Sequence, residues 1–327
     1  MKCLGCFVLT EEVYCKKCRK ALFDNQKLST ILDFDKKEFL SATVALSEQM
    51  SISGVQDKIS LKIENEKLMP TSTDGAYLLK PIPLMEYGEF IEDVAKNEHF
   101  TMQLASQVFK LETAKNALIA FSDGELAYMT KRFDRADGMK IKQEDFSSLA
   151  GYTEQSHGKN YKYDYAYEQI GGLIKQYLPS YKIEVLKFFK LVLFNYLVGN
   201  GDAHLKNFSV LQRSTQDYGL SPAYDLLSSF LHLPNESRTA LEFFKAYETK
   251  SFEANGFYAY DDFMVLAKFL EIPEKMAEKV LRDFLSKEKT TLGLLENSFL
   301  NDEAKERYKI LFLDRIKAVS YSFEKKR

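Results

Sequence analysis

The sequence has 327 residues, of which 45% are hydrophobic and 28% are charged, as is ordinary for a globular protein. A formal net charge of −2 gives no electrostatic argument for binding nucleic acid or a membrane surface. No uncharged apolar run approaches the ~20 residues of a spanning helix, and the N-terminus lacks the apolar core of a secretory signal. We therefore expect a cytoplasmic protein with no membrane partner and no direct nucleic-acid partner.

All four cysteines lie within the first 18 residues, at Cys3, Cys6, Cys15 and Cys18. Two C-x2-C pairs are typical of a structural zinc site, whose metal can hold together a segment too small for a hydrophobic core. The alternatives are two disulfides, which a reducing cytosol disfavours, and a redox-active pair of dithiols. We expect a zinc knuckle over residues 1–28.

The next part of the chain has the alternating apolar pattern of β-strands. Ile59, Leu61 and Ile63 alternate with polar residues, and an Asp-Gly turn at 123–124 joins two later strands. Strands are predicted over 59–64, 67–69, 76–80, 114–121 and 126–133, and helices over 36–45 and 89–109. We expect these elements to form a β-rich N-lobe over residues 29–142.

Strand signals nearly vanish after residue 142. Helices are predicted to begin at 143–149 and to continue at 165–176, 181–198, 260–270, 273–288, 293–299 and 302–323, with one short hairpin at 207–220. A β-rich lobe followed by an α-helical C-lobe over 143–327 predicts an α+β, bilobal, protein-kinase-like fold with a cleft between its lobes. The hinge is expected at 143–150.

A polar loop follows the apolar segment that ends at residue 198, because Gly199 and Gly201 break the helix. Asp202 and Asn207 are five residues apart, as in phosphotransferases where an aspartate accepts the proton of the attacking hydroxyl and an asparagine binds metal. Asp225 supplies a second acidic residue, which would complete the metal site. We expect Asp202 to be the general base and Asn207 and Asp225 to bind Mg²⁺, although either aspartate could instead stabilise a turn.

Four further residues are candidates for contacts with phosphate. His204 and Lys206 lie in the same polar loop as catalytic candidates, and a structural histidine and a solvated surface lysine are the open alternatives. Lys80 ends a predicted strand, and Glu98 lies on the predicted helix that follows. This order repeats the Lys–Glu pair with which kinases hold the α- and β-phosphates of ATP.

Several motifs in this order resemble those of the HipA family of bacterial serine/threonine kinases, which are toxins of toxin–antitoxin modules. The motifs are Ser51–Lys58, Asn97–His99, Lys131–Arg135, Gln143–Phe146, Gly201–Ser209 and Tyr224–Leu226. Only 50 residues precede the first motif, as in short HipT-like members, which lack an N-terminal subdomain that is a separate protein in their systems. The cysteine knuckle lies outside the resemblance.

The resemblance implies a set of residues that contact ATP. The backbone of the serine-rich loop would contact phosphate, Lys80 and Glu98 would form the phosphate-binding pair, and the hinge would contact adenine. The ATP-binding set is Ser51, Ser53, Gly54, Val55, Lys80, Glu98, Glu144 and Phe146, and the open alternative for Phe146 is a place in the core. Ser51 and Ser53 would also be autophosphorylation sites, and a phosphate there would block nucleotide binding.

By the same resemblance, the protein would be a toxin kinase that uses ATP and Mg²⁺ to phosphorylate a translation-related protein such as an aminoacyl-tRNA synthetase. A DNA-binding antitoxin and a separate N-terminal-subdomain protein would be its partners. Two alternatives remain open. One is a small-molecule phosphotransferase of the aminoglycoside type, whose Asp-x-His-x-x-Asn loop is nearly the same, and the other is a non-catalytic nucleotide-binding scaffold.

Overall fold

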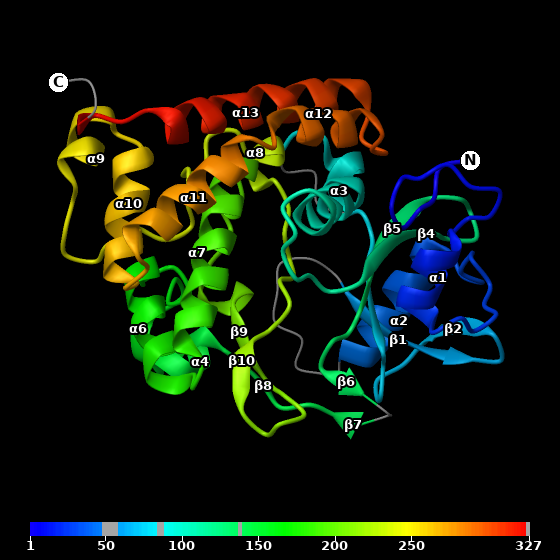
Figure 1. Cartoon of the computed structure of the whole chain (residues 1–327). Coiled ribbons are helices and arrows are strands. Elements are labelled where there is room, and N and C mark those ends of the chain that lie inside the picture. Colours follow the sequence, from blue (N-terminus) through cyan, green and yellow to red (C-terminus); the bar gives the residue numbers. More distant parts are fainter. Residues whose placement is uncertain (48–57, 84–87, 137–138, 325–327) are drawn as a thin grey trace.

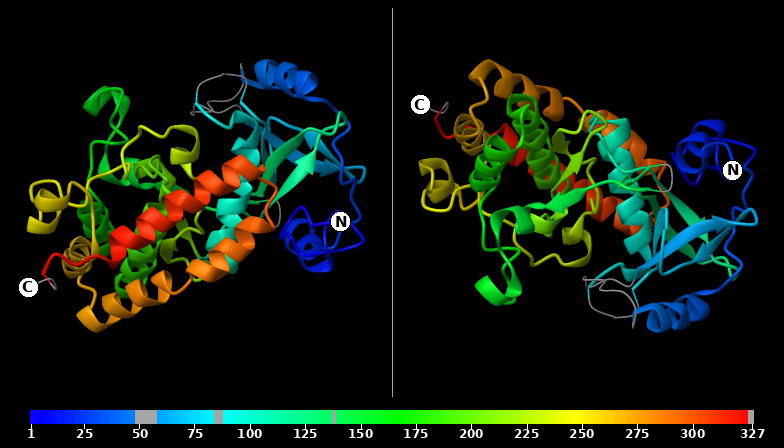
Figure 2. Two further views of the ribbon diagram at one scale, coloured as in Figure 1. Left: turned by 90° about the horizontal axis from the view of Figure 1, so that it is seen from above. Right: turned by 90° about the horizontal axis from the view of Figure 1, so that it is seen from below.

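The computed structural model describes residues 1–47, 58–83, 88–136 and 139–324. A sheet-rich half, coloured blue to cyan with some green, lies beside a helical half coloured green to red (Figure 1). Figure 2 shows the same two halves from above and from below. The predicted α+β, bilobal fold is confirmed, with the four-cysteine segment at the N-terminus of the sheet-rich half.

The sheet-rich half is built on five antiparallel strands in the order β2-β1-β3-β5-β4. They are β1 (Ile59–Glu64), β2 (Lys67–Pro70), β3 (Tyr77–Lys80), β4 (Asn116–Ala120) and β5 (Leu126–Lys131). All five were predicted, with slightly different ends. A two-stranded ribbon of β6 (Arg135–Ala136) and β7 (Met139–Lys140) follows, which the sequence pattern did not predict.

Helices cover both faces of this sheet. A turn of 3-10 helix, η1 (Ile91–Asp93), leads into α3 (Val94–Gln107), which contacts β4 and β5. The opposite face packs against α1 (Lys16–Phe23) and α2 (Lys36–Ser47). Successive strand residues point to opposite faces, and accordingly Leu118 belongs to the core shared with α3 while Ala117 belongs to the core under α1.

The helical half is organised around α7 (Tyr181–Val198), which contacts α6 and α13. The other helices are α4 (Phe146–Ala150), α5 (Glu154–His157), α6 (Tyr167–Tyr177), η2 (Leu205–Asn207), α8 (Ser229–His232), α9 (Lys250–Asn255), α10 (Tyr260–Phe269), α11 (Glu274–Leu285), α12 (Glu288–Glu296) and α13 (Asp302–Ser320). Helix α12 reaches α3 of the other half. Across the described ranges, no helix has the length and apolarity needed to span a membrane.

The hinge between the halves begins as a strand, so the prediction of a helix from residue 143 is wrong for its first three residues. β8 (Gln143–Asp145) pairs with β9 (Ser209–Gln212), which also pairs with β10 (Tyr218–Leu220). Asp145 then caps α4, because its carboxylate accepts a hydrogen bond of 2.9 Å from the backbone N–H of Ser148. The capping aspartate therefore delays the helix until Phe146.

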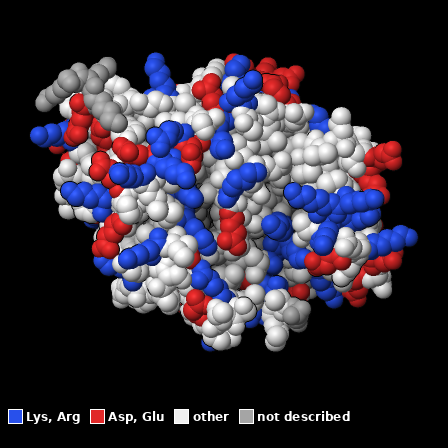
Figure 3. All heavy atoms as spheres, viewed as in Figure 1, with Lys and Arg blue, Asp and Glu red and all other residues white. Residues whose placement is uncertain are grey.

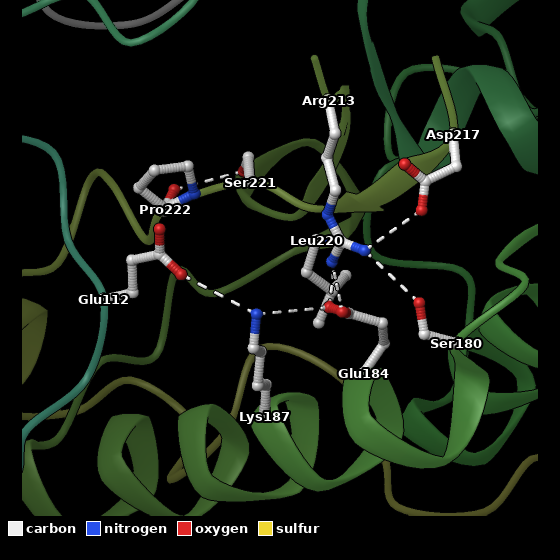
Figure 4. A network of polar contacts seen from close by, with 9 residues as sticks. All are labelled: Glu112, Ser180, Glu184, Lys187, Arg213, Asp217, Leu220, Ser221 and Pro222. Atoms are coloured by element: carbon white, nitrogen blue, oxygen red, sulfur yellow. Dashed lines mark hydrogen bonds and ion pairs between the residues drawn. The ribbon is translucent and has the colours of Figure 1, made fainter. Parts of the chain in front are cut away.

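A buried polar network fixes the β9–β10 hairpin on α7 (Figure 4). The fully buried carboxylate of Glu184 accepts hydrogen bonds from Arg213 Nη2 (2.5 Å) and from the backbone N–H of Leu220 (3.0 Å). Lys187 Nζ lies 3.7 Å from the same carboxylate. A buried charge is stable only when it is paired in this way. The network therefore positions the segment that joins the catalytic-loop candidate to Asp225.

Candidate active site

A cavity of about 1270 Å³ lies between the two halves. Seven of the predicted site residues line it: Lys80, Glu98, Asp202, His204, Lys206, Asn207 and Asp225. Over the face seen in Figure 3, basic and acidic side chains are intermixed, in keeping with the small net charge. Residues separated by up to 145 positions in the chain thus meet in one cavity.

Lys80 joins the two halves across the cavity. From the end of β3, its Nζ donates to Glu98 Oε1 on α3 (2.7 Å) and to Asp225 Oδ1 (2.5 Å). Burial alone would lower the pKa of Lys80, but the two carboxylates outweigh it and raise that pKa above its usual value. The ammonium group therefore stays charged inside the cavity, where phosphate could be held.

The two carboxylates differ because they share one ammonium group. Burial raises the pKa of Glu98 to about 7 in spite of Lys80. Burial acts in the same direction on Asp225, but there Lys80 prevails and the pKa of Asp225 is lowered. The closer contact of Lys80 is with Asp225, which leaves the burial of Glu98 less fully compensated. Asp225 is therefore the more firmly ionised member, as a metal ligand requires.

Asp225 has a backbone conformation that is unusual for a residue other than glycine. Its φ is 52°, in the left-handed region, which costs an L-residue roughly 1–2 kcal/mol. The residues before it are held in place, because Ala114 N–H donates to Ala223 O (2.9 Å) and the Tyr224 hydroxyl donates to Lys206 O (2.8 Å). Strain of this kind tends to occur where function fixes a side chain, and here it directs the carboxylate toward Lys80.

Asp202 and Asn207 are brought together by the loop after α7. Gly199 ends the helix with a φ of 65°, which glycine adopts readily. Asn207 Nδ2 donates to the backbone oxygen of Asp202 (2.9 Å), which leaves the amide oxygen of Asn207 available to a cation. The Asp202 carboxylate accepts a hydrogen bond of 2.5 Å from the Tyr163 hydroxyl. The loop thus presents a carboxylate and an amide oxygen five residues apart.

His204 and Lys206 take different places in this loop. Burial lowers the pKa of His204, and its Nε2 lies 3.8 Å from Asp202 Oδ1. Its buried Nδ1 has no hydrogen-bond partner among the described residues. Lys206 Nζ donates to Asp145 Oδ2 (2.8 Å), which ties the loop to the hinge. Both side chains line the cavity, and neither position was evident from the motif alone.

A half-buried carboxylate, Glu236, supports the candidate catalytic loop through Ser229. Gly201 N–H donates to Ser229 Oγ (2.7 Å), and Ser229 Oγ donates to Glu236 Oε1 (2.5 Å). A Cβ at position 201 would lie 2.6 Å from the Glu236 carboxyl carbon, so only glycine fits there. Burial raises the pKa of Glu236 to about 7. Sequence analysis missed Glu236 and Ser229, which lie well downstream of the motif.

The predicted adenine contacts are placed differently from expectation. Phe146 is fully buried in the core, and Glu144 is exposed; neither lines the cavity. Their neighbours Gln143 and Asp145 do, because alternate residues of a strand face opposite sides. The structure therefore does not bring the side chains of Glu144 and Phe146 to the cavity wall.

The serine-rich loop falls in a range that the structure does not describe. Ser51, Ser53, Gly54 and Val55, predicted to contact ATP, lie outside the described residues. Lys58, the first described residue after that range, lines the cavity, and burial lowers its pKa.

The four cysteines converge as their spacing predicted. All four Sγ atoms lie within 4.8 Å of one another, and Cys6 and Cys15 are 3.7 Å apart. Four sulfurs around a zinc ion at about 2.3 Å would be about 3.8 Å apart, so this arrangement fits a tetrahedral metal ion. Cys3 Sγ also accepts hydrogen bonds from the backbone N–H groups of Gly5 (3.4 Å) and Cys15 (3.2 Å). All four of these described cysteines are free thiols rather than disulfides.

This cysteine knuckle packs on α3, the helix that carries Glu98. The ring of Phe7 lies 4.9 Å from that of His99, and the buried Nε2 of His99 is 3.4 Å from Gly5 O. Gln107 Nε2 donates to Cys6 O (3.3 Å). One helix thus contacts the knuckle and also supplies Glu98 to the cavity.

Comparisons with known proteins agree on the family and the fold. Residues 50–291 match the family described as "HipA-like C-terminal domain". A kinase-named protein of Haemophilus influenzae is 27% identical over 296 residues, which cover 85% of this chain and 84% of the relative. Y4dM of Sinorhizobium fredii, also named as a kinase, is 29% identical over 252 residues, covering 72% of this chain and 57% of the relative.

Two solved structures share the fold. HipA of Shewanella oneidensis, in a complex with HipB and operator DNA, superposes with a TM-score of 0.60 and 18% identity, covering 83% of this chain and 65% of that one. The proinflammatory kinase CtkA of Helicobacter pylori gives a TM-score of 0.56 and 16% identity, covering 83% and 91%. The kinase-named relatives and this fold together support a kinase-type function.

Proposed function

We propose, since this chain belongs to the HipA-like C-terminal domain family, that it transfers the γ-phosphate of ATP to a serine or threonine hydroxyl of a protein. The observation that carries the proposal is the meeting of Lys80, Glu98 and Asp225 with Asp202 and Asn207 around one cavity. Phosphoryl transfer needs positioning and charge stabilisation rather than covalent chemistry from the protein. These five side chains supply both.

On the nucleotide side, Lys80 would bind the α- and β-phosphates, held in place by Glu98. Asp225 and the amide oxygen of Asn207 are hard oxygen ligands of the kind that Mg²⁺ prefers. Bound Mg²⁺ would supply charge neutralisation between the phosphates. Asp225, which Lys80 holds at 2.5 Å, would be the carboxylate ligand of that ion.

On the acceptor side, Asp202 would orient the hydroxyl and accept its proton as the oxygen bonds to phosphorus. His204, whose Nε2 lies 3.8 Å from Asp202 Oδ1, would contact phosphate or brace the loop. Lys206, held by Asp145, would steady the negative charge on the transferred phosphate.

We further propose that the kinase acts as the toxin of a HipA-like system, in the manner of the short HipT-like members. The fold neighbour from Shewanella oneidensis was solved with HipB and DNA, which supports a DNA-binding antitoxin as one partner. A separate N-terminal-subdomain protein would be a second partner, as the resemblance to the short HipT-like members implies. A translation-related target such as an aminoacyl-tRNA synthetase would place the protein in the cytoplasm. Autophosphorylation of Ser51 or Ser53 would put about two negative charges close in sequence to Lys58, against the phosphates of ATP.

For the N-terminal segment, we propose that Cys3, Cys6, Cys15 and Cys18 bind a structural Zn²⁺. Four thiolates leave no open position for catalysis, and the packing of Phe7 on His99 joins the knuckle to α3. The proposed domains are the knuckle at 1–28, the N-lobe at 29–142 and the helical C-lobe at 143–327.

Labelling of a cell lysate with γ-labelled ATP tests the kinase proposal. Wild-type protein and Asp225→Ala are incubated with lysate proteins and, separately, with small alcohols such as aminoglycosides. The proposal expects label on serine or threonine of a few proteins with the wild type and none with Asp225→Ala. Asp283→Ala changes an exposed aspartate on α11 and serves as the control. Label on a small alcohol alone would favour the aminoglycoside-type enzyme, and ATP binding without any transfer would favour a scaffold.

A further inference from the structure

The hydroxyl of Tyr163 occupies the place on Asp202 that an acceptor hydroxyl would take. Tyr163 Oη donates to Asp202 Oδ1 at 2.5 Å, and both residues line the cavity. A serine or threonine hydroxyl that reacts with ATP must make the same contact with the same carboxylate. Tyr163 therefore already occupies Oδ1, one of the two carboxylate oxygens to which an acceptor hydroxyl could donate.

Tyr163 is held in this position by the loop between α5 and α6. Its N–H donates to Asn160 O (2.8 Å), and the carbonyl of Lys162 accepts a hydrogen bond of 3.1 Å from the N–H of Leu205 in the catalytic loop. The ring of Tyr163 lies edge-on to that of His204, with centroids 5.1 Å apart. Backbone and ring contacts thus fix the tyrosine against the catalytic loop itself.

The contact joins a phenol donor to a carboxylate at a partly exposed position. Burial, together with the hydrogen bond to Asp202, raises the pKa of Tyr163, so the phenol remains a hydrogen-bond donor at neutral pH. A hydrogen bond to an ionised carboxylate is shorter and stronger than a neutral one. The residue is nevertheless 36% exposed, so an incoming protein segment can reach it and turn it aside.

Resting on the proposed phosphotransfer, we propose that Tyr163 is a positioning residue that caps Asp202 until a protein acceptor displaces it, and so prevents water from taking the acceptor's place. In the productive reaction the acceptor oxygen bonds to the γ-phosphorus, the bond to the β–γ bridging oxygen breaks to leave ADP, and the acceptor's proton passes to Asp202. With water as the acceptor, the same bonds form and break and yield inorganic phosphate. The cap selects between these two outcomes.

Tyr163→Phe tests the cap, because it keeps the ring beside His204 and removes only the hydroxyl. With γ-labelled ATP and Mg²⁺, free phosphate is measured without acceptor, and the ratio of free phosphate to protein-bound label is measured with lysate proteins. We expect acceptor-independent hydrolysis to rise about tenfold, the size of one hydrogen bond to a charged group, and the ratio to shift toward free phosphate. Tyr165→Phe removes a hydroxyl from the same loop but outside the cavity lining and should match the wild type.

The outcomes separate this inference from the proposed function. If the wild type transfers label to protein but Tyr163→Phe hydrolyses ATP no faster, the cap is wrong and the kinase stands. A Tyr163→Phe protein with slower transfer and unchanged hydrolysis would likewise overturn the cap, since the tyrosine would then only orient Asp202. If the wild type transfers label to no acceptor, both the proposed function and the cap are wrong. ATP binding by both proteins, measured by calorimetry, checks that each is folded.

Discussion

The four cysteines of the knuckle lie within the first 18 residues, whereas Lys80 and Asp225, which meet in the cavity, are 145 positions apart. The knuckle is a local structure that its own metal could hold together. The cavity exists only when both halves of the molecule are folded, because Lys80 on β3 must meet Glu98 on α3 and Asp225 beyond β10. The spacing of the cysteines therefore predicts the knuckle directly, whereas the residues of the cavity can be brought together only by the fold.

The two regions meet at α3, which contacts the knuckle through His99 and the cavity through Glu98. Loss of the metal would loosen one side of this helix without removing any side chain from the cavity. Changes in the cavity should stop phosphotransfer and spare zinc binding. Changes in the knuckle should remove zinc and stability first, and affect phosphotransfer only through α3.

The largest effect is expected for Asp202→Asn. The amide cannot accept the acceptor's proton, so kcat should fall about a thousandfold, within the range of general-base loss, while zinc content stays unchanged. Initial rates with γ-labelled ATP and metal analysis of the same preparation measure both. A variant with wild-type kcat would remove Asp202 from catalysis.

Cys3→Ser should disrupt the knuckle rather than the cavity. We expect loss of about one zinc ion per chain and destabilisation on the order of 5 kcal/mol for the knuckle. Amide exchange should quicken in residues 1–23 and modestly in α3, and kcat should change far less than in Asp202→Asn. Full zinc content in Cys3→Ser, or unchanged exchange in α3, would contradict the coupling.

The pH dependence of stability tests the raised pKa of Glu98. Its pKa rises from 4.5 in the unfolded chain to about 7 in the folded protein, so the native state binds more protons between these values. The contribution of Glu98 to the free energy of unfolding is therefore fully present below about pH 4.5 and is lost as the pH rises through about 7. The difference is at most about 3 kcal/mol. Urea midpoints at about pH 5 and about pH 8 should differ less in Glu98→Gln than in the wild type. If the two midpoints differed by the same amount in both proteins, burial would not raise the pKa of Glu98 as proposed.

The smallest effect is expected for Gln107→Ala, which removes the hydrogen bond between α3 and Cys6 O and a second one to Gln103 Oε1 within the helix. Unfolding free energy should fall by about 1 kcal/mol, with zinc still bound and kcat nearly unchanged. Gln176→Ala, at an exposed helical position on α6, provides the matched control. Loss of zinc from Gln107→Ala would mean that the helix, rather than the cysteine spacing, holds the knuckle together.

Local signals in the sequence predicted much of this molecule. Alternation predicted all five strands of the main sheet, and the five-residue offset predicted that Asp202 and Asn207 lie together in one loop. The resemblance supplied the pairing of Lys80 with Glu98, which spacing alone could not assign.

Contacts between distant segments could not be predicted from the sequence. Tyr163 is 39 residues from Asp202, and Asp145 is 61 residues from Lys206, and no periodicity links either pair. The capping role of Asp145 likewise turned the expected start of a helix into a strand. Such partners depend on tertiary packing, which a linear pattern does not encode.

The central claim is that Lys80, Glu98, Asp225, Asp202 and Asn207 form one phosphotransfer site. A crystal structure with a non-hydrolysable ATP analogue and Mn²⁺, located by its anomalous signal, tests it most directly. The account predicts the metal on Asp225 and Asn207, Lys80 on the α- and β-phosphates, and the γ-phosphate facing Asp202. A nucleotide bound elsewhere, or a metal that does not contact Asp225, would contradict it.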